Sequence, residues 1–426
     1  MTRGKLPLGI QNFEELRKGG YLYADKTDMV WQIANGDKYN FLSRPRRFGK
    51  SLLVSTLQCY FEGKKELFEG LKIMELEKDW IKRPVIHFSM NLGGSDAESL
   101  YHYLDDTLTK YEEIYGKRAT EATLSNRFTG IIERAYQQSG EQVAVLVDEY
   151  DAPLQHSYLT DRHEKCRNLY RDFFTGLKDY GYCIKCVFLT GITKFTQISL
   201  FSVLNTLSNI SFYNCYATIC GLTKEEILEN LKDELQALAA QKKWDIDQTM
   251  HELKDMYDGY HFSESLQGGY NPFSVISALK ERLLRPYWIA SGATEMLPKI
   301  LTNFEKDVET LDGSLIDMDY IETADISKDY PKLFLYQSGY LTIKGVIGET
   351  YRLGFPNREV KKALLELVVP NMLNANKEET EIASRHYADA YAASKKKLIS
   401  LALVFDKENR GLIDWQEADK QIALDY

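Results

Sequence analysis

Short apolar runs alternate with helix-periodic segments over about the first two hundred residues. The runs are four to six residues long and read as buried strands, while apolar residues between them recur at steps of three and four. Such alternation predicts βαβ units and a mostly parallel sheet, so we expect a three-layer α/β fold. The predicted strands are 39–42, 85–88, 143–147 and 184–189, and the predicted helices lie near 49–61, 97–115, 120–138 and 163–180.

From about Gly221 the sequence becomes charged and helix-periodic. Thr223 is a candidate N-cap, and Glu226 stands three residues later, where the second member of a capping box is found. We therefore expect a helical subdomain over 221–290.

A β-hairpin is predicted further along the chain. Gly339–Lys344 alternates apolar and polar residues, Gly345–Gly348 supplies a turn, and Tyr351–Leu353 returns. The hairpin follows helices and precedes a probable helix start at Asn357, so we expect a winged-helix-like α+β region over 291–370.

The segment with the clearest chemistry follows the first predicted strand, where Gly49-Lys50-Ser51 opens a helix. A phosphate-binding loop needs backbone N–H groups at a helix N-terminus, a lysine for the β- and γ-phosphates and a hydroxyl for Mg²⁺. Lys50 and Ser51 match those roles. The match to Gly-x-x-x-x-Gly-Lys-[Ser/Thr] is incomplete, because Arg44 stands where the first glycine is expected.

Cations crowd this loop in a chain of net charge −9. Such crowding is self-repulsive unless a polyanion binds there; the alternative is a solvated basic loop with a chance Gly-Lys-Ser. The cations are Arg44, Arg46, Arg47 and Lys50.

The apolar run 143–147 ends in Asp148-Glu149, as a Walker B strand does. Asp148 would bind Mg²⁺, directly or through water, and Glu149 would orient or deprotonate the attacking water. The alternative is an ordinary turn after a buried strand. Asp151 would either support this site or cap the following turn.

The next strand, 184–189, is followed by Thr190 and Thr193. In a P-loop sheet this strand brings a polar group beside the γ-phosphate, so either threonine could sense it. An ordinary role at the end of a strand explains both residues equally well.

The composition of the chain restricts which partners it can bind and where in the cell we expect it. Lys plus Arg total 53 and Asp plus Glu 62, so nothing draws the whole molecule to nucleic acid or anionic lipid, and any such binding must be local. Six cysteines in so long a chain are not a disulfide framework. With no apolar leader and no apolar run of membrane-spanning length, we expect a cytoplasmic protein without membrane partners.

Other motifs carry less weight. Cys183 and Cys186 have zinc or redox spacing, but no second Cys/His pair follows, so we interpret them as core thiols. His156, His163 and Cys166 could meet on a helix face, although a structural role is the better interpretation. No arginine-rich later motif supports a helicase.

Taken in order, six separated motifs resemble the bacterial AAA-ATPase-like family, whose members commonly carry a C-terminal domain of the PD-(D/E)XK nuclease superfamily. The resemblance covers about residues 5–365. The motifs are Tyr23–Thr27, Ser43–Ser51, Asp148–Asp151, Thr190–Phe195, Tyr257–Phe262 and Tyr270–Phe273.

The resemblance implies a P-loop NTPase core over 1–220, with ATP and Mg²⁺ as cofactors. The arginine-rich loop is the family's own variant, so Arg44 is no anomaly. Asp25 would lie near the nucleotide base, and the last two motifs would belong to a helical lid. The nucleotide-binding set is Asp25, Arg46, Arg47, Phe48, Gly49, Lys50, Ser51 and Leu52; the metal ligands are Ser51 and Asp148; and the catalytic set is Lys50, Asp148, Glu149 and Thr190.

The C-terminus departs from the family. A nuclease of this superfamily needs an acid followed by a strand with [Asp/Glu]-x-Lys, and no such strand follows Pro370. Glu359-Val360-Lys361 has the spacing but is interpreted as a solvated helix turn. We interpret 371–426 as a remnant of the nuclease-like domain and expect no nuclease activity.

We therefore expect an Mg²⁺-dependent P-loop ATPase that couples nucleotide state to motion of its lid and winged-helix-like region. One of Arg46 or Arg47 would bridge to phosphate or to a neighbouring subunit of a homo-oligomer. The alternative is a scaffold whose nucleotide is not hydrolysed and whose winged-helix-like region binds DNA. A third hypothesis, in which the basic loop itself binds nucleic acid, predicts competition between ATP and DNA.

Overall fold

The computed structural model describes residues 4–195, 207–288, 311–324 and 330–364, together with Leu297, Ile300 and the strands at 401–405 and 412–417. Contacts within the chain divide it into two units, Met1–Ala363 and Leu364–Tyr426. The first unit contains all of the candidate site residues.

A five-stranded parallel sheet forms the centre of the first unit, with the order β2-β3-β4-β1-β5. All six residues of β3 are buried, as expected of a parallel strand covered on both faces. The four predicted strands are confirmed. The strands are β1 (Tyr39–Ser43), β2 (Val85–Ser89), β3 (Val143–Asp148), β4 (Ile184–Gly191) and β5 (Ser208–Asn209).

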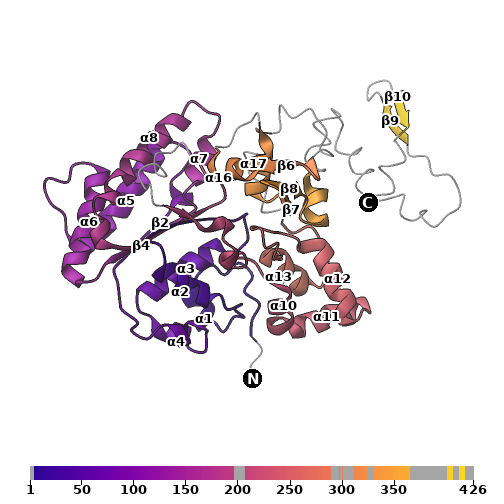
Figure 1. The fold of residues 1–426 in the computed structure, drawn as a ribbon, viewed down its shortest axis with the longest axis horizontal. Coiled ribbons are helices and arrows are strands. Elements are labelled where there is room, and N and C mark those ends of the chain that lie inside the picture. The colour runs from indigo at the N-terminus through magenta and orange to yellow at the C-terminus, as the bar shows by residue number, and fades with distance from the viewer. Residues whose placement is uncertain are drawn as a thin grey trace. The chain divides into compact units, whose positions relative to one another are not determined.

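Helices cover the sheet on both sides, with α1–α4 on one side and α5, α6 and α8 on the other (Figure 1). The α/β prediction is confirmed. In the described ranges no helix is both long enough and apolar enough to cross a bilayer. The α-helices of this part of the chain are α1 (Phe13–Lys18), α2 (Thr27–Asn35), α3 (Lys50–Phe61), α4 (Ile73–Leu76), α5 (Ala97–Tyr115), α6 (Leu124–Ser139), α7 (Ala152–Ser157) and α8 (His163–Phe174).

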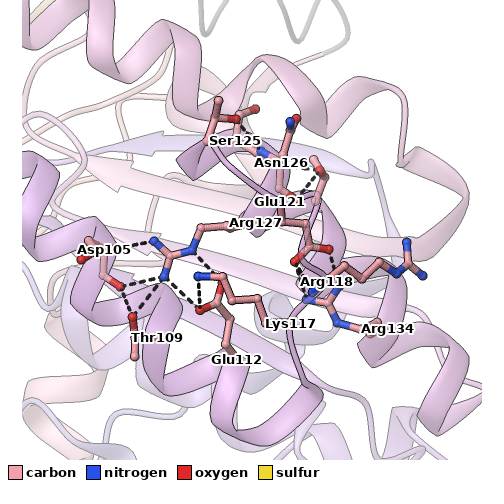
Figure 2. Close-up of polar contacts among 12 residues, drawn as sticks. Asp105, Thr109, Glu112, Lys117, Arg118, Glu121, Ser125, Asn126, Arg127 and Arg134 are labelled. Atoms are coloured by element: carbon pink, nitrogen blue, oxygen red, sulfur yellow. Dashed lines mark hydrogen bonds and ion pairs between the residues drawn. The ribbon is translucent and has the colours of Figure 1, made fainter.

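An ion-pair network joins α5 to α6 (Figure 2). The Arg127 guanidinium binds the Glu112 carboxylate, with Nε to Oε1 at 2.6 Å and Nη2 to Oε2 at 3.0 Å, and also pairs with Asp105. Arg134 of α6 pairs through its two terminal nitrogens with Glu121, which lies in the segment between the two helices. Burial opposes the charge of Glu112, but hydrogen bonds from Arg127 and Lys117 lower the pKa of its carboxyl. The network thus fixes how α6 lies against α5.

A second group of helices follows the core: α10 (Lys224–Asn230), α11 (Lys232–Lys242), α12 (Ile246–Tyr257) and α13 (Pro272–Glu281). The predicted capping box is confirmed, because Thr223 Oγ1 accepts from the Glu226 N–H at 3.2 Å and Glu226 Oε2 accepts from the Thr223 N–H at 2.9 Å. Tyr257, Tyr260 and Tyr270 are buried, as expected of core aromatics. That these helices act as a lid stays a prediction.

The predicted hairpin is present as β7 (Thr342–Ile347) and β8 (Thr350–Gly354), in a sheet of order β6-β8-β7 with β6 (Leu315–Asp317). Its turn is shorter than predicted, because Gly345 and Ile347 already pair with Arg352 and Thr350 of β8; a register shift separates Ile343 from Gly345 within β7. The helices α16 (Met318–Thr323) and α17 (Pro331–Ser338) lie between β6 and β7 in sequence. The winged-helix interpretation stays a prediction, since part of 291–370 lies outside the described residues.

Glu359 is not solvated, so that prediction is wrong. A helix does begin at Arg358, with Asn357 Oδ1 accepting from the Val360 N–H at 3.1 Å. The Glu359 side chain nevertheless turns inward, where it accepts hydrogen bonds from Ser274 Oγ at 2.9 Å and the Trp288 N–H at 2.7 Å. Only tertiary contacts decide this burial, because a glutamate in a first helical turn is usual at the surface too.

In the second unit, β9 (Leu401–Phe405) pairs with β10 (Leu412–Glu417) in antiparallel fashion. Most of the segment after Pro370 lies outside the described residues. The nuclease remnant and the absence of nuclease activity therefore stay predictions.

Candidate functional site

The candidate site lies where β1, β3 and β4 end. The register pairs Ser43 with Gly191 and Val147 with Leu189, so the three strands end at one edge of the sheet. Since β4 lies between β1 and β3, the loop after β1 and the acids after β3 flank the end of β4. Three motifs that are far apart in sequence thus meet at one edge.

Gly49 ends the cationic loop and is the N-cap of α3. Its φ of 92° lies in the left-handed region, which glycine adopts without strain. A Cβ at this position would have no atom within 4 Å, so the space around it is open. No side chain caps the N-terminus of α3, so its first N–H groups, including those of Ser51 and Leu52, are available to an anion.

Lys50 is buried in the first turn of α3, and its Nζ donates to the carbonyl oxygens of Arg44 at 2.9 Å and Pro45 at 3.0 Å. Burial lowers the pKa of the ammonium, and the charges of Glu149, Asp148 and Asp151 oppose that shift. The lysine of the loop and the acids at the end of β3 are therefore electrostatic neighbours.

Two buried oxygens of this edge have no hydrogen-bond partner within the described chain: Asp148 Oδ1 and Thr190 Oγ1. A buried polar atom without a partner is costly, so such atoms point to a ligand, an ion or water. A carboxylate oxygen is the kind of donor that Mg²⁺ prefers. Asp148 therefore fits the metal role predicted for it, and Thr190 presents a hydroxyl on the neighbouring strand.

Glu149 has a φ of 49°, which is uncommon for a residue with a side chain. Burial raises the pKa of its carboxyl, an effect that Lys50 opposes and Asp148 reinforces. A strained backbone and a perturbed carboxyl at one position are typical of functional sites.

The Asp151 side chain binds the segment that follows β4. Its Oδ2 accepts from the Thr193 N–H and hydroxyl, both at 2.6 Å, and from the Ile192 N–H at 3.0 Å. Asp151 stands at the N-cap position of α7, but its side chain makes no capping hydrogen bond there, and its carbonyl accepts the ordinary helical bond from the Gln155 N–H. Because the Thr193 hydroxyl is engaged, Thr190 is the better candidate sensor.

The Arg44 side chain lies in the interior and is not available to a ligand. It is buried, donates to the carbonyls of Ser211 at 2.9 Å and Tyr216 at 2.9 Å, and lies 4.3 Å above the Phe262 ring. The predicted crowding of four cations is therefore wrong for Arg44, which packs in the interior.

Arg46 and Arg47 are more accessible. The Arg46 charge acts on Glu149, which places it beside the acids. Arg47 is exposed, has a φ of 69°, and stacks over the Phe273 ring of α13 at 4.7 Å.

Phe48 and Asp25 are held by the protein itself. The Phe48 ring meets those of Tyr260 and Phe262 edge-on at 4.8 and 5.5 Å, so only its backbone could contribute to a ligand site. The Asp25 carboxylate accepts from the N–H groups of Thr27 at 2.9 Å and Lys72 at 2.7 Å. Its predicted place near a nucleotide base is untested.

Sequence reasoning missed Trp288. Its indole Nε1 donates to the Arg46 carbonyl at 3.3 Å across 242 residues of chain. No local pattern could have indicated a tertiary contact of this kind.

The described parts of the chain hold no cluster of three or more His, Cys, Asp or Glu side chains arranged for a metal. A cation at Asp148 would therefore take further ligands from a hydroxyl, phosphate or water, which is the usual environment of Mg²⁺ beside nucleotides.

Two comparisons with known proteins identify the family of this chain. The family model described as predicted AAA-ATPase matches residues 7–201, which include every candidate site residue. A protein of Azotobacter chroococcum mcd 1, described as an uncharacterized protein in the vnfD 5' region, is 36% identical over 380 residues. That similarity covers 87% of this chain and 70% of the relative. The chain therefore belongs to the AAA-ATPase-like family.

Proposed function

We propose that this chain is a Mg²⁺-dependent ATP-binding protein that hydrolyses ATP slowly at the edge formed by β1, β3 and β4. Membership of a family of predicted AAA-ATPases indicates ATP binding. The observation that carries the proposal is the convergence of Lys50, in the first turn of α3, with Asp148 and Glu149 at the end of β3.

In this proposal the phosphates bind the Lys50 ammonium and the backbone N–H groups of Gly49 to Leu52 at the start of α3. Ser51 and Asp148 hold the metal. Mg²⁺, when bound, neutralises phosphate charge. Catalysis is then positioning plus charge stabilisation.

Glu149 orients or deprotonates water, and a carboxyl whose pKa is raised by burial suits a general base. The Thr190 hydroxyl senses the terminal phosphate from the end of β4. The bonds that Asp151 makes keep the segment after β4 next to these groups.

Coupling would follow from what the loop touches. Phe48 packs on Tyr260 and Phe262, and Arg47 packs on Phe273. A nucleotide that changes the conformation of the loop would therefore also change its contacts with the helical segment that follows residue 221. We propose that this segment responds as a lid, together with the winged-helix-like region.

The test compares Mg-ATP binding by calorimetry and phosphate release in Lys50→Ala, Glu149→Gln and a control, Lys65→Ala, at an exposed lysine outside the site. We expect Lys50→Ala to lower kcat/KM roughly 100-fold or more, Glu149→Gln to bind but not hydrolyse, and the control to match the parent. If Lys50→Ala and Glu149→Gln both bind and turn over ATP like the parent, the assignment is wrong.

Tight binding by the parent without phosphate release would favour the scaffold hypothesis. Salt-dependent retention of duplex DNA would then be the next measurement.

A further inference from the structure

Trp288 connects the phosphate loop to residues far along the chain. Its ring is buried, packs edge-on against Tyr340 at 5.0 Å, and donates its Nε1–H to the Arg46 carbonyl at 3.3 Å. The indole N–H is the only hydrogen-bonding group of this side chain, so the bond to the Arg46 carbonyl helps to orient the ring together with its packing on Tyr340.

The Trp288 backbone is held by Glu359. The carboxylate accepts from the Trp288 N–H at 2.7 Å and from Ser274 Oγ of α13 at 2.9 Å, and only 1% of Glu359 is exposed. No salt bridge to Glu359 occurs among the described residues. Burying a carboxylate is costly, so one that binds neutral donors is expected to have a role that a hydrophobic residue would not serve.

We propose that Glu359 is a positioning residue for nucleotide binding, acting through Trp288 on the Arg46 carbonyl of the phosphate loop. The inference rests on the function proposed above, because it concerns the same loop.

The backbone of the loop explains why this contact matters. The carbonyl of Arg46 and the N–H of Arg47 belong to one planar trans peptide, so they point in opposite directions. Holding the carbonyl against the indole therefore directs the Arg47 N–H away from Trp288. The next residue needs such support, since Arg47 has a φ of 69°.

The strength of the contact depends on the charge of Glu359. The charge of Glu359 acts on the hydroxyls of Tyr257, Tyr260 and Tyr287 and raises their pKa values, while the adjacent cation, Arg358, pairs with Glu252 and Asp255 instead. Burial raises the pKa of the Glu359 carboxyl to about 7, while the bonds from Trp288 and Ser274 oppose the shift. The ionised form accepts the Trp288 N–H more strongly than the protonated form, so the link tightens above neutral pH.

The experiment measures the Kd of Mg-ATP by calorimetry in the full chain. The variants are Glu359→Gln, which removes the charge, and Trp288→Phe, which removes the indole N–H but keeps a ring against Tyr340. Glu229→Gln and Trp244→Phe are matched controls away from the loop. We expect each of the two test variants to weaken binding roughly 5-fold, the loss of about one hydrogen bond, and the controls to bind like the parent.

The double variant separates positioning from general destabilisation. If Glu359 acts through Trp288, adding Glu359→Gln to Trp288→Phe should weaken binding no further. Equal effects of Glu359→Gln in both backgrounds would overturn the proposal. Trp288→Phe tests the indole step alone, so unchanged affinity in that variant would overturn it even if Glu359→Gln did not fold.

The pH dependence is a further readout that a merely structural role would not move. The ratio of the parent's affinity to that of Glu359→Gln should rise between pH 6 and pH 8, and titration of the nucleotide itself cancels in this ratio. A constant ratio contradicts the proposal. If the parent binds no Mg-ATP at all, both the proposed function and this inference are wrong. If the parent binds Mg-ATP and the variants bind it equally well, only this inference is wrong.

Discussion

The Asp151 carboxylate accepts two hydrogen bonds from Thr193, one from its N–H and one from its hydroxyl, both at 2.6 Å. These bonds join the end of β3 to the segment after β4, next to the candidate catalytic groups. A glycine at position 191 belongs to the same arrangement, because a Cβ there would overlap the Asp151 carboxylate.

Asp151→Asn should destabilise the fold by about 2 kcal/mol, because a buried acceptor of several N–H and O–H groups is replaced by an amide that must turn an NH₂ toward donors. Urea denaturation measures the free energy of unfolding. Asp161→Asn, at an exposed aspartate, is the control and should be nearly neutral. Equal stability of the two variants would show that the Asp151 bonds contribute nothing net.

Gly259→Ala should be strongly destabilising. Gly259 has a φ of 89°, and a Cβ there would overlap the carbonyl oxygen of Pro356. Gly140 also has a positive φ, 73°, in the left-handed helical region, but a Cβ there would meet nothing within 4 Å. We expect Gly140→Ala to cost about 1 kcal/mol from backbone strain, and Gly259→Ala about 2 kcal/mol more from the overlap. Thermal unfolding of the two variants measures the difference, which would vanish if the overlap were relieved freely.

The network between α5 and α6 should matter for stability in proportion to its burial (Figure 2). Arg127→Met leaves Glu112 without its main partner in a place where the arginine side chain is only 7% exposed, and should cost about 3 kcal/mol. Arg118 is 51% exposed in its pair with Glu133, so Arg118→Met should cost at most about 1 kcal/mol. Urea denaturation distinguishes the two, and the reverse order would refute the argument.

Stability should depend on pH through Glu359. Its carboxyl has a pKa of about 7 in the folded chain against 4.5 as the ordinary value, so the folded state holds the proton more tightly. The destabilising effect of the charge is complete above pH 7, decreases as the pH falls from 7 to 4.5, and is absent below that. The unfolding free energy of the parent relative to Glu359→Gln should therefore rise by up to about 3 kcal/mol on going from pH 8 to pH 4.5.

Denaturant titrations of both proteins at several pH values check this, because titration of all other groups cancels in the difference. Glu229→Gln, at an exposed glutamate of α10, should give a pH-independent difference. A flat curve for Glu359→Gln would mean that the Glu359 carboxyl titrates as an exposed one does.

Much of the core followed from local pattern. The four central strands and the helix at Lys50 were predictable because a buried parallel strand must be apolar and a helix must be periodic, whatever their neighbours. The helix predicted over 120–138 begins later, at Leu124, because Thr123 accepts from the Asn126 N–H and caps it there.

The sequence by itself determined which side chains with phosphate or metal chemistry stand at strand ends, because residue type and spacing are local properties. Only the tertiary structure decided which of them share a site. It placed β4 between β1 and β3, turned Arg44 into the interior, and engaged the Thr193 hydroxyl with Asp151, while the Thr190 hydroxyl has no hydrogen-bond partner among the described residues. The tertiary structure alone also decided the hydrogen bonds from Trp288 to Glu359 and from Trp288 to the Arg46 carbonyl. Burial and long-range hydrogen bonds depend on how distant segments pack, and no pattern within one segment records that.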